Sequence, residues 1–376
     1  MNYKNLTKLT LAIAAVAFVV QSCTSNEEAP LKETYLELPA TPYTYNNGDN
    51  NLPTLGRVLF YDRQLSLNNS VSCASCHKQA LAFADNVAQS KGFDNKLTSR
   101  NSMPIQNLGG FFFVGGVFND LRDSLFTNGD VFFGSQTLFW DGRENDVNKM
   151  VLRPIVNHVE MGISDLDKLA AKLQNVPYYK ELFLKAFGSE EVTTERISAG
   201  LSSFILTIGS QNTRFDKFLR GQIQLSAQEL NGQQLFIQTY ECNECHQVGN
   251  PHGYVLAGTF ANIGLDPVYD DGGVEHATGN PNDAGKFKIP SLRNVLLTAP
   301  YMHDGRFETL EDVFEHYSSG IDDHPNLDHR LRDNTGSPIA MNISTQDKRS
   351  IVAFLGTLTD QDMLSDPKFS NPFKTK

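Results

Sequence analysis

The pattern C-x-x-C-H occurs twice in this chain of 376 residues. The two triplets are Cys73, Cys76 and His77, and Cys242, Cys245 and His246. Two such thiols can form thioethers to the vinyl groups of a porphyrin, and the neighbouring histidine can ligate the iron from the proximal side. A redox dithiol and half of a zinc site are the alternatives for C-x-x-C alone. Zinc is disfavoured because adjacent Cys and His side chains suit one tetrahedral ion poorly.

Cysteine usage adds to this interpretation. The chain has five cysteines, four of which lie in the two motifs, and the fifth is Cys23. An exported protein normally uses its cysteines in structural disulfides. None is left over for a disulfide here, so the sequence predicts two covalently attached c-type haems.

The N-terminus has the pattern of an export signal. Lys4 and Lys8 precede an apolar run from Leu9 to Val20, which is too short to span a bilayer comfortably. The run ends just before Cys23, which predicts a bacterial lipoprotein signal over residues 1–22, lipidation at Cys23 and a polar tether over residues 23–50. An ordinary cleaved signal with an incidental cysteine is the alternative. We expect the protein on the periplasmic face of a bacterial membrane, anchored by the lipid, or otherwise soluble in the periplasm.

Composition is that of a globular protein, with 40% hydrophobic and 20% charged residues. The formal net charge is −11, and no basic run or stripe occurs. Nucleic acid is therefore not an expected partner.

The motifs around each C-x-x-C-H also repeat in order. Arg100-Asn101 and Asp141-Gly142-Arg143 follow the first copy, and Arg293-Asn294 and Asp304-Gly305-Arg306 follow the second. The duplication predicts a mainly α protein with two cytochrome c-like domains, each around one covalently attached c-type haem. We place the N-terminal haem domain at residues 51–212 and the C-terminal one at residues 213–376.

Hydrophobic periodicity and capping residues predict the helices. They cover residues 166–187 with a break near Pro177, 193–208, 226–238 starting at a Ser226/Glu229 capping box, 309–320 and 344–358. The stretches 109–130 and 247–287 are predicted to be loops.

With these motifs in place, the chain resembles the bacterial di-haem cytochrome c peroxidase family, including the branch that matures tryptophylquinone cofactors. The matching stretches run from about Leu55 to Leu358. They are LGRVLFYDRQLSLNNSVSCASCH, RNSMP, LFWDGR, RPIVNHVEMG, CNECH, FKIPSLRNVLLTAPYMHDGRFETLEDVFEHY and IVAFLGTLT.

The resemblance implies a division of labour between the haems. The N-terminal haem, with His77 as proximal ligand, would be the peroxide site, and the C-terminal haem, with His246, would receive electrons. Glu160 matches the family's distal glutamate, which moves a proton during O–O cleavage, and Trp140 matches the tryptophan between the haems. A solvated surface Glu160 and a merely packed Trp140 are the alternatives.

Two positions depart from the family pattern at the N-terminal haem. Many members carry a distal histidine there that must leave on reductive activation, and Phe93 stands in its place. His158 is the other histidine before Cys242, and it could be a second proton group, a replacement ligand or a surface residue. Met150 replaces a glutamine found ten residues before the glutamate in many relatives.

The distal ligand of the C-terminal haem is open between Tyr317 and Met302. Tyr317 is favoured by its position in the family motif, where the quinone-maturing branch also has tyrosine. Met302 is favoured by ligand chemistry, because Met/His ligation raises the reduction potential of a haem, as a haem that receives electrons needs. The resemblance also implies a calcium ion held by the Asn101 side chain and the carbonyls of Thr298 and Pro300, a set of oxygen ligands that suits a hard cation.

Three functions are compatible with these residues. The first is a peroxidase that reduces hydrogen peroxide with electrons from a small cytochrome c or cupredoxin. The second is an oxidase of a protein or small molecule through long-range electron transfer, which Phe93 and Tyr317 favour. The third is a non-enzymatic di-haem electron carrier, which an open iron beside Glu160 argues against. A homodimer is compatible with the sequence.

Overall fold

The computed structural model describes residues 34–45, 50–108, 137–248 and 260–375. The predicted signal, the predicted lipidation site Cys23, part of the tether and the predicted loop over 109–130 lie outside these ranges. Residues 36–373 belong to one compact unit, which contains both C-x-x-C-H motifs. No helix within the described ranges is long and apolar enough to cross a membrane.

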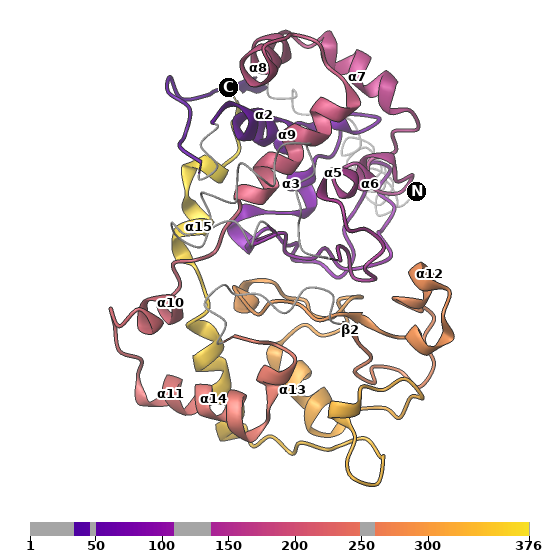
Figure 1. The fold of residues 1–376 in the computed structure, drawn as a ribbon, viewed down its shortest axis with the longest axis vertical. Coiled ribbons are helices and arrows are strands. Elements are labelled where there is room, and N and C mark those ends of the chain that lie inside the picture. The colour runs from indigo at the N-terminus through magenta and orange to yellow at the C-terminus, as the bar shows by residue number, and fades with distance from the viewer. Residues whose placement is uncertain (1–33, 46–49, 109–136, 249–259, 376) are drawn as a thin grey trace, which may run out of the picture. The chain divides into compact units, whose positions relative to one another are not determined.

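Helices dominate the structure (Figure 1), which confirms the mainly α prediction. The helices that precede residue 213 are α2 (Asn51–Tyr61), α3 (Cys73–Cys76), α5 (Val147–Met150), α6 (Arg153–Val156), α7 (Leu166–Gln174), α8 (Pro177–Phe187) and α9 (Thr194–Thr207). The later ones are α10 (Arg214–Leu219), α11 (Ala227–Gln234), α12 (Glu275–Thr278), α13 (Leu310–Ser319), α14 (Thr345–Gly356) and α15 (Gln361–Ser365).

Strands are few and short. Strand β1 (Thr34–Leu36) pairs with β4 (Phe373–Thr375), and β2 (Phe260–Ala261) pairs with β3 (Phe287–Lys288). The second pair is antiparallel, with Phe260 opposite Lys288 and Ala261 opposite Phe287. Strand β2, helix α12 and the first residue of β3 lie within the predicted loop over 247–287, so its described part contains short regular elements.

The predicted helix boundaries follow from local capping chemistry. Helix α7 ends at Gln174 and α8 begins at Pro177, because proline fits the first turn of a helix but not its interior. Ser226 and Glu229 form the predicted capping box at the start of α11. After Gln234 a π-helical segment, Leu235–Thr239, carries the chain to the second C-x-x-C-H motif.

Each half of the chain has a core built on one close helix crossing. In the first half α2 packs on α9, where a β-carbon on Gly56 would lie 1.9 Å from the Gly200 carbonyl oxygen. In the second half α11 packs on α14, and a β-carbon on Gly232 would lie 1.9 Å from the Ser350 carbonyl oxygen. Glycine lets the two backbones touch in both crossings. The two crossings are visible as the α2/α9 and α11/α14 pairs (Figure 1).

Apolar side chains form two separate buried clusters, one in each half. The first gathers residues between Tyr45 and Ile208 and also takes in Met363 and Phe369 from the C-terminal segment. The second runs from Phe215 to Leu358. Tyr45, which falls in the predicted tether, is buried and donates its hydroxyl to the Lys368 carbonyl at 3.0 Å. The boundary predicted between residues 212 and 213 stays a prediction.

The duplicated Asp-Gly-Arg motifs share one local conformation. Gly142 and Gly305 have φ of 67° and 69°, which favours glycine. In each copy the arginine N–H donates to the aspartate, Asp141 or Asp304, at 3.3 and 3.1 Å. The sequence repeat is therefore also a repeat of local structure.

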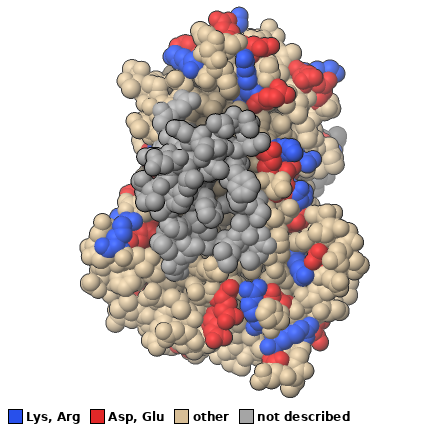
Figure 2. All heavy atoms as spheres, in the orientation of Figure 1, with Lys and Arg blue, Asp and Glu red and all other residues tan. Residues whose placement is uncertain are grey.

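Charged side chains of both signs are interspersed over the described part of the face in Figure 2.

Replacing Gly56 with alanine should lower the free energy of unfolding by about 2–3 kcal/mol, because the added methyl would push α2 away from α9. Urea unfolding of the haem-loaded protein, followed by circular dichroism, measures this. Gly209→Ala is the matched control, since its β-carbon would meet nothing closer than 3.9 Å. Equal midpoints for the two variants would show that the crossing tolerates a side chain.

Candidate functional site

The first C-x-x-C-H motif begins as a single capped helical turn. The Ser72 N–H donates to the Ser75 hydroxyl at 2.9 Å, which completes a capping box at the start of α3. The His77 N–H donates to the Cys73 carbonyl at 2.9 Å. Its ring Nδ1 lies 2.9 Å from the Phe83 carbonyl oxygen. A carbonyl only accepts, so Nδ1 carries the proton and Nε2 keeps a free lone pair.

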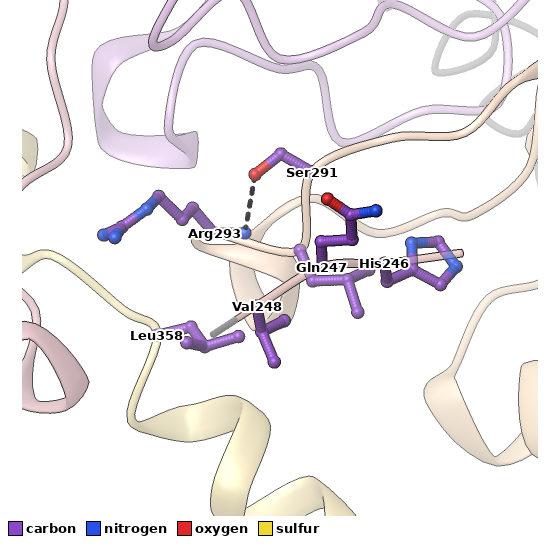
Figure 3. A pocket seen from close by; sticks show the side chains of 7 residues that line it. His246, Gln247, Val248, Ser291, Arg293 and Leu358 are labelled. Carbon is purple, nitrogen blue, oxygen red and sulfur yellow. Dashed lines mark hydrogen bonds between the residues drawn. The ribbon is translucent and has the colours of Figure 1, made fainter. Parts of the chain in front are cut away.

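The second motif reaches the same arrangement on a 3₁₀ turn, Cys242–Glu244. The His246 N–H donates to the Cys242 carbonyl at 2.9 Å, and its Nδ1 lies 3.0 Å from the Pro290 carbonyl oxygen. Both histidines therefore present Nε2 as a ligand atom. Figure 3 shows His246 and Gln247 beside a pocket that Val248, Ser291, Leu292, Arg293 and Leu358 also line.

All four motif cysteines are free thiols, and none is in a disulfide. Burial raises the pKa of Cys73 and of Cys242 to about 12 and that of Cys76 to about 11. Burial also lowers the pKa of His77 and of His246, which keeps both imidazoles neutral. Neutral imidazoles with a free Nε2 beside paired thiols fit a covalently attached haem in each half.

Glu160 lies close to the first motif. The Asn157 side chain accepts the N–H groups of Val159 and Glu160 at 2.8 and 3.2 Å and so shapes the turn that carries Glu160. The Glu160 side chain interacts electrostatically with Cys73 and with Cys76. Burial raises its pKa, partly offset by the positive charge of Arg143. Glu160 is therefore not a freely solvated surface residue.

Phe93 is fixed against the same turn. Its N–H donates to the Glu160 carbonyl at 2.9 Å, and a β-carbon on Gly162 would lie 2.5 Å from the Phe93 ring. An apolar ring thus occupies the place where many family members have histidine. His158 is exposed, as the surface interpretation expected.

Trp140 forms hydrogen bonds with residues of both halves of the chain. Its Nε1–H donates to the Asn101 carbonyl at 2.9 Å, and its own carbonyl accepts the Lys288 N–H at 2.8 Å. The Lys288 ammonium donates to the Thr137 carbonyl at 2.7 Å, and burial lowers the pKa of Lys288 to about 8. Trp140 is therefore hydrogen-bonded as well as packed, and its two partners belong to the two predicted domains.

Sequence reasoning missed the ion pairs around this junction. Arg100 bonds Asp141 at 2.6 Å and holds Asp271 with two bonds of 2.6 and 2.7 Å. Burial alone would raise the pKa of Asp271. The hydrogen bonds from Arg100 outweigh this effect and lower the pKa of Asp271 to about 2. Beside them the rings of Phe287 and His303 stack at 3.6 Å between centroids. Asp271 stands 171 residues from Arg100, and no sequence pattern marks the pairing.

Tyr317 and Met302 are placed differently. Burial raises the pKa of Tyr317, and the nearby thiols of Cys245 and Cys242 raise it further. Within the described residues its hydroxyl has no hydrogen-bond partner. Met302 lies in the turn between Tyr301 and Phe307 with a φ of 75°. The distal ligand of the C-terminal haem stays a prediction, with Tyr317 near the thiols of the second motif.

The residues expected to hold calcium lie on adjoining segments. The Asn101 N–H donates to the His303 carbonyl at 2.7 Å, close in sequence to Thr298 and Pro300. The Asn101 amide donates to the Val87 carbonyl at 3.0 Å, and no hydrogen bond from a described residue occupies its Oδ1. Among the described residues, no group of three or more His, Cys, Asp or Glu side chains is placed to hold a metal ion. The calcium site, which would use other oxygen atoms, stays a prediction.

Known proteins resemble this chain over most of its length. The model of the di-haem cytochrome c peroxidase family matches residues 50–224. The methylamine utilization protein MauG of Methylorubrum extorquens is 32% identical over 81% of this chain and 77% of its own. The cytochrome c551 peroxidase of Nitrosomonas europaea is 32% identical over 74% of this chain and 75% of its own.

Structural comparison agrees with the sequence comparison. The crystal structure of a MauG-like protein associated with microbial copper homeostasis has a TM-score of 0.70 and 31% identity, covering 93% of this chain and 99% of that one. With both motifs, their histidine geometry and these relatives together, the chain belongs to the di-haem cytochrome c peroxidase family and accordingly carries two c-type haems.

Proposed function

We propose that this protein is a di-haem peroxidase that reduces hydrogen peroxide to water, with electrons delivered one at a time by a small cytochrome c or cupredoxin. The observation that carries the proposal is the half-buried Glu160, which lies near the thiols of the first motif and has a pKa raised by desolvation. A peroxidase needs a proton-transferring group at an iron with an open position.

At the first site the chain's own residues handle the proton. A haem held by Cys73, Cys76 and His77 supplies the iron at which peroxide binds. The Glu160 carboxylate takes the proton from one peroxide oxygen and delivers it to the leaving oxygen. A pKa raised by burial brings Glu160 closer to neutral pH, where a carboxyl group both accepts and donates a proton effectively.

Electrons would enter at the second site, through the haem held by Cys242, Cys245 and His246. We assign Trp140 to the route toward the first site. The support is that its carbonyl accepts the Lys288 N–H and its indole N–H donates to the Asn101 carbonyl. These hydrogen bonds hold the indole in one orientation, which suits an electron-transfer role. The family's calcium, held by Asn101, Thr298 and Pro300, would stiffen the same junction.

A second function has one observation in its favour. The Tyr317 hydroxyl lies near Cys242 and Cys245, where it could ligate the second iron. An oxygen ligand stabilises oxidised iron, whereas methionine favours reduced iron, so tyrosine suits an enzyme that stores oxidising power for a larger substrate. This would make the protein an oxidase like the one implied by its MauG relatives. Turnover of peroxide with a reduced carrier supports the peroxidase; reaction only with an oxidisable substrate supports the oxidase.

We place the protein at the periplasmic face of a bacterial membrane, held by a lipid on Cys23. The support is the apolar run from Leu9 to Val20 that precedes this cysteine. Labelling of cells with a radioactive fatty acid tests the anchor, and Cys23→Ala should abolish the label.

Protein made in a host that matures c-type cytochromes should carry two haem additions by mass spectrometry. Cys73→Ser/Cys76→Ser should carry one addition, because thioether formation at the first motif needs those thiols. A single addition in the wild type, or bound zinc, would contradict the assignment.

Glu160→Gln should lower peroxide turnover by about 10²-fold and leave the haem spectrum nearly unchanged, because only proton transfer is lost. The wild-type rate should rise with pH through the pKa of Glu160, since the carboxylate must accept the proton. Burial raises that pKa, so the midpoint should lie above 4.5, the usual value for glutamate. The acid limb should vanish in Glu160→Gln. His158→Gln, at an exposed position, should behave as wild type.

The resting protein should contain a high-spin, five-coordinate or water-bound ferric haem and should react with peroxide without prior reduction. The physical reason is that Phe93 packs against Gly162 and offers no ligand. Low-temperature EPR of the oxidised protein measures the spin states. Two low-spin haems, with activity only after half-reduction, would refute this; conversion by His158→Gln of one haem to high spin would then identify His158 as the ligand.

A further inference from the structure

A buried carboxylate, Asp62, receives the hydroxyls of two neighbouring tyrosines. Asp62 directly follows α2 and is 4% exposed. Its Oδ2 accepts from the Tyr178 hydroxyl at 2.7 Å and from the Tyr179 hydroxyl at 2.6 Å, and its Oδ1 accepts the Gln64 N–H at 2.8 Å. No described Lys or Arg side chain forms an ion pair with it. The chemistry proposed above does not use this group.

The two tyrosines connect the interior with the surface. They open helix α8, and their ring centroids are 4.8 Å apart with planes inclined by 55°. Tyr179 is fully buried, whereas Tyr178 is half-buried and also accepts a hydrogen bond from the Gln64 side chain at 3.0 Å. One ring therefore belongs to the core and its contact partner reaches solvent.

Tyr179 lies on the side of the first haem motif. Cys73 packs against the same apolar cluster that contains Tyr179. The Tyr179 and Cys73 side chains are also close enough to interact electrostatically. Tyr179 is thus the buried end of the pair, near the first C-x-x-C-H motif, and Tyr178 is the partly exposed end.

A hydrogen-bonded base decides whether a tyrosine can be oxidised. The phenol becomes a strong acid when it loses an electron, so a base within hydrogen-bond reach must take its proton. A carboxylate can do this and a backbone carbonyl cannot. In this protein one carboxylate oxygen, Asp62 Oδ2, accepts hydrogen bonds from both tyrosine hydroxyls.

We propose that Tyr179 and Tyr178 form a relay that carries an oxidising equivalent from the first haem site to the surface, with Asp62 as the proton acceptor. The relay rests on the proposed function, because hydrogen peroxide is the oxidant. Tyr179 gives one electron to the peroxide-oxidised haem site and its hydroxyl proton to Asp62 Oδ2, which leaves a neutral phenoxyl radical.

The second step returns the inner tyrosine to its resting state. Tyr178 gives one electron to the Tyr179 radical, Asp62 returns its proton to Tyr179, and the Tyr178 proton moves to the same Asp62 oxygen. A one-electron reductant at the surface then restores Tyr178, which takes its proton back from Asp62. This route from the first haem site to the surface includes neither Trp140 nor the second haem.

The test treats haem-loaded protein with one molar equivalent of hydrogen peroxide in the absence of an electron donor. Freeze-quench EPR detects a tyrosyl radical, and the optical spectrum follows the haems. We expect a tyrosyl signal in the wild type and its loss in Tyr179→Phe and in Asp62→Asn. In Tyr178→Phe the signal should remain, but a spin trap should no longer label the α8 peptide seen by mass spectrometry.

Tyr61→Phe is the matched control and should keep the full signal. Its hydroxyl donates to the Phe369 carbonyl at 2.7 Å, so it has no base to accept its proton. An optical change without a tyrosyl signal in the wild type, or a full signal in Tyr179→Phe, overturns the relay alone. The absence of any optical change with peroxide overturns the proposed function and the relay with it.

Discussion

A hydrogen bond from histidine Nδ1 to a backbone carbonyl is the contact on which both halves of the molecule depend. His77 makes it to Phe83 and His246 makes it to Pro290, at 2.9 and 3.0 Å. Each bond selects one tautomer, orients the ring and leaves Nε2 for iron. The surrounding backbone is shaped to deliver the acceptor: Phe83 is fully buried at a φ of 60°, and Pro290 follows strand β3.

The junction between the halves is held by buried charge. Arg100 of the first half binds Asp141 and, across the junction, Asp271 of the second half. Within the second half, Arg293 binds Asp216 with two bonds of 2.8 and 2.6 Å. Buried ion pairs add little net stability, but loss of one partner leaves an uncompensated charge and is strongly destabilising. The Arg100 pairs therefore favour one arrangement of the segments next to Trp140, which the proposed electron route would need.

Buried and half-buried carboxylates in this protein differ in chemistry because their neighbours differ. Arg100 and Arg293 lower the pKa values of Asp271 and Asp216, which remain charged structural groups. Glu160 has only the weaker influence of Arg143 to offset its burial, so its pKa rises and it can exchange a proton. Asp62 meets two phenols, which suits it to accept protons from them. The same functional group is thus structural where an arginine pairs with it, and we propose acid–base and relay roles for it where none does.

The sequence by itself determined the features whose causes are local. Two thiols three residues apart and an adjacent histidine identify haem attachment, because the chemistry needs only one turn of chain. Helix limits such as the break at Pro177 and the Ser226 cap were predictable for the same reason. The duplication followed from the order of the motifs, and the resemblance to known relatives supplied roles for Glu160 and Trp140.

Only the tertiary structure decided which distant groups meet. Asp271 reaches Arg100 across 171 residues, and Tyr178 and Tyr179 reach Asp62 across 116 and 117. The Pro290 carbonyl, 44 residues from His246, was equally invisible in the sequence. These contacts arise from how α2, α8 and the segment around β3 pack, and packing depends on the shape and volume of many side chains at once. No short pattern encodes such a meeting, so the partners that tune each titratable group become visible only in the folded chain.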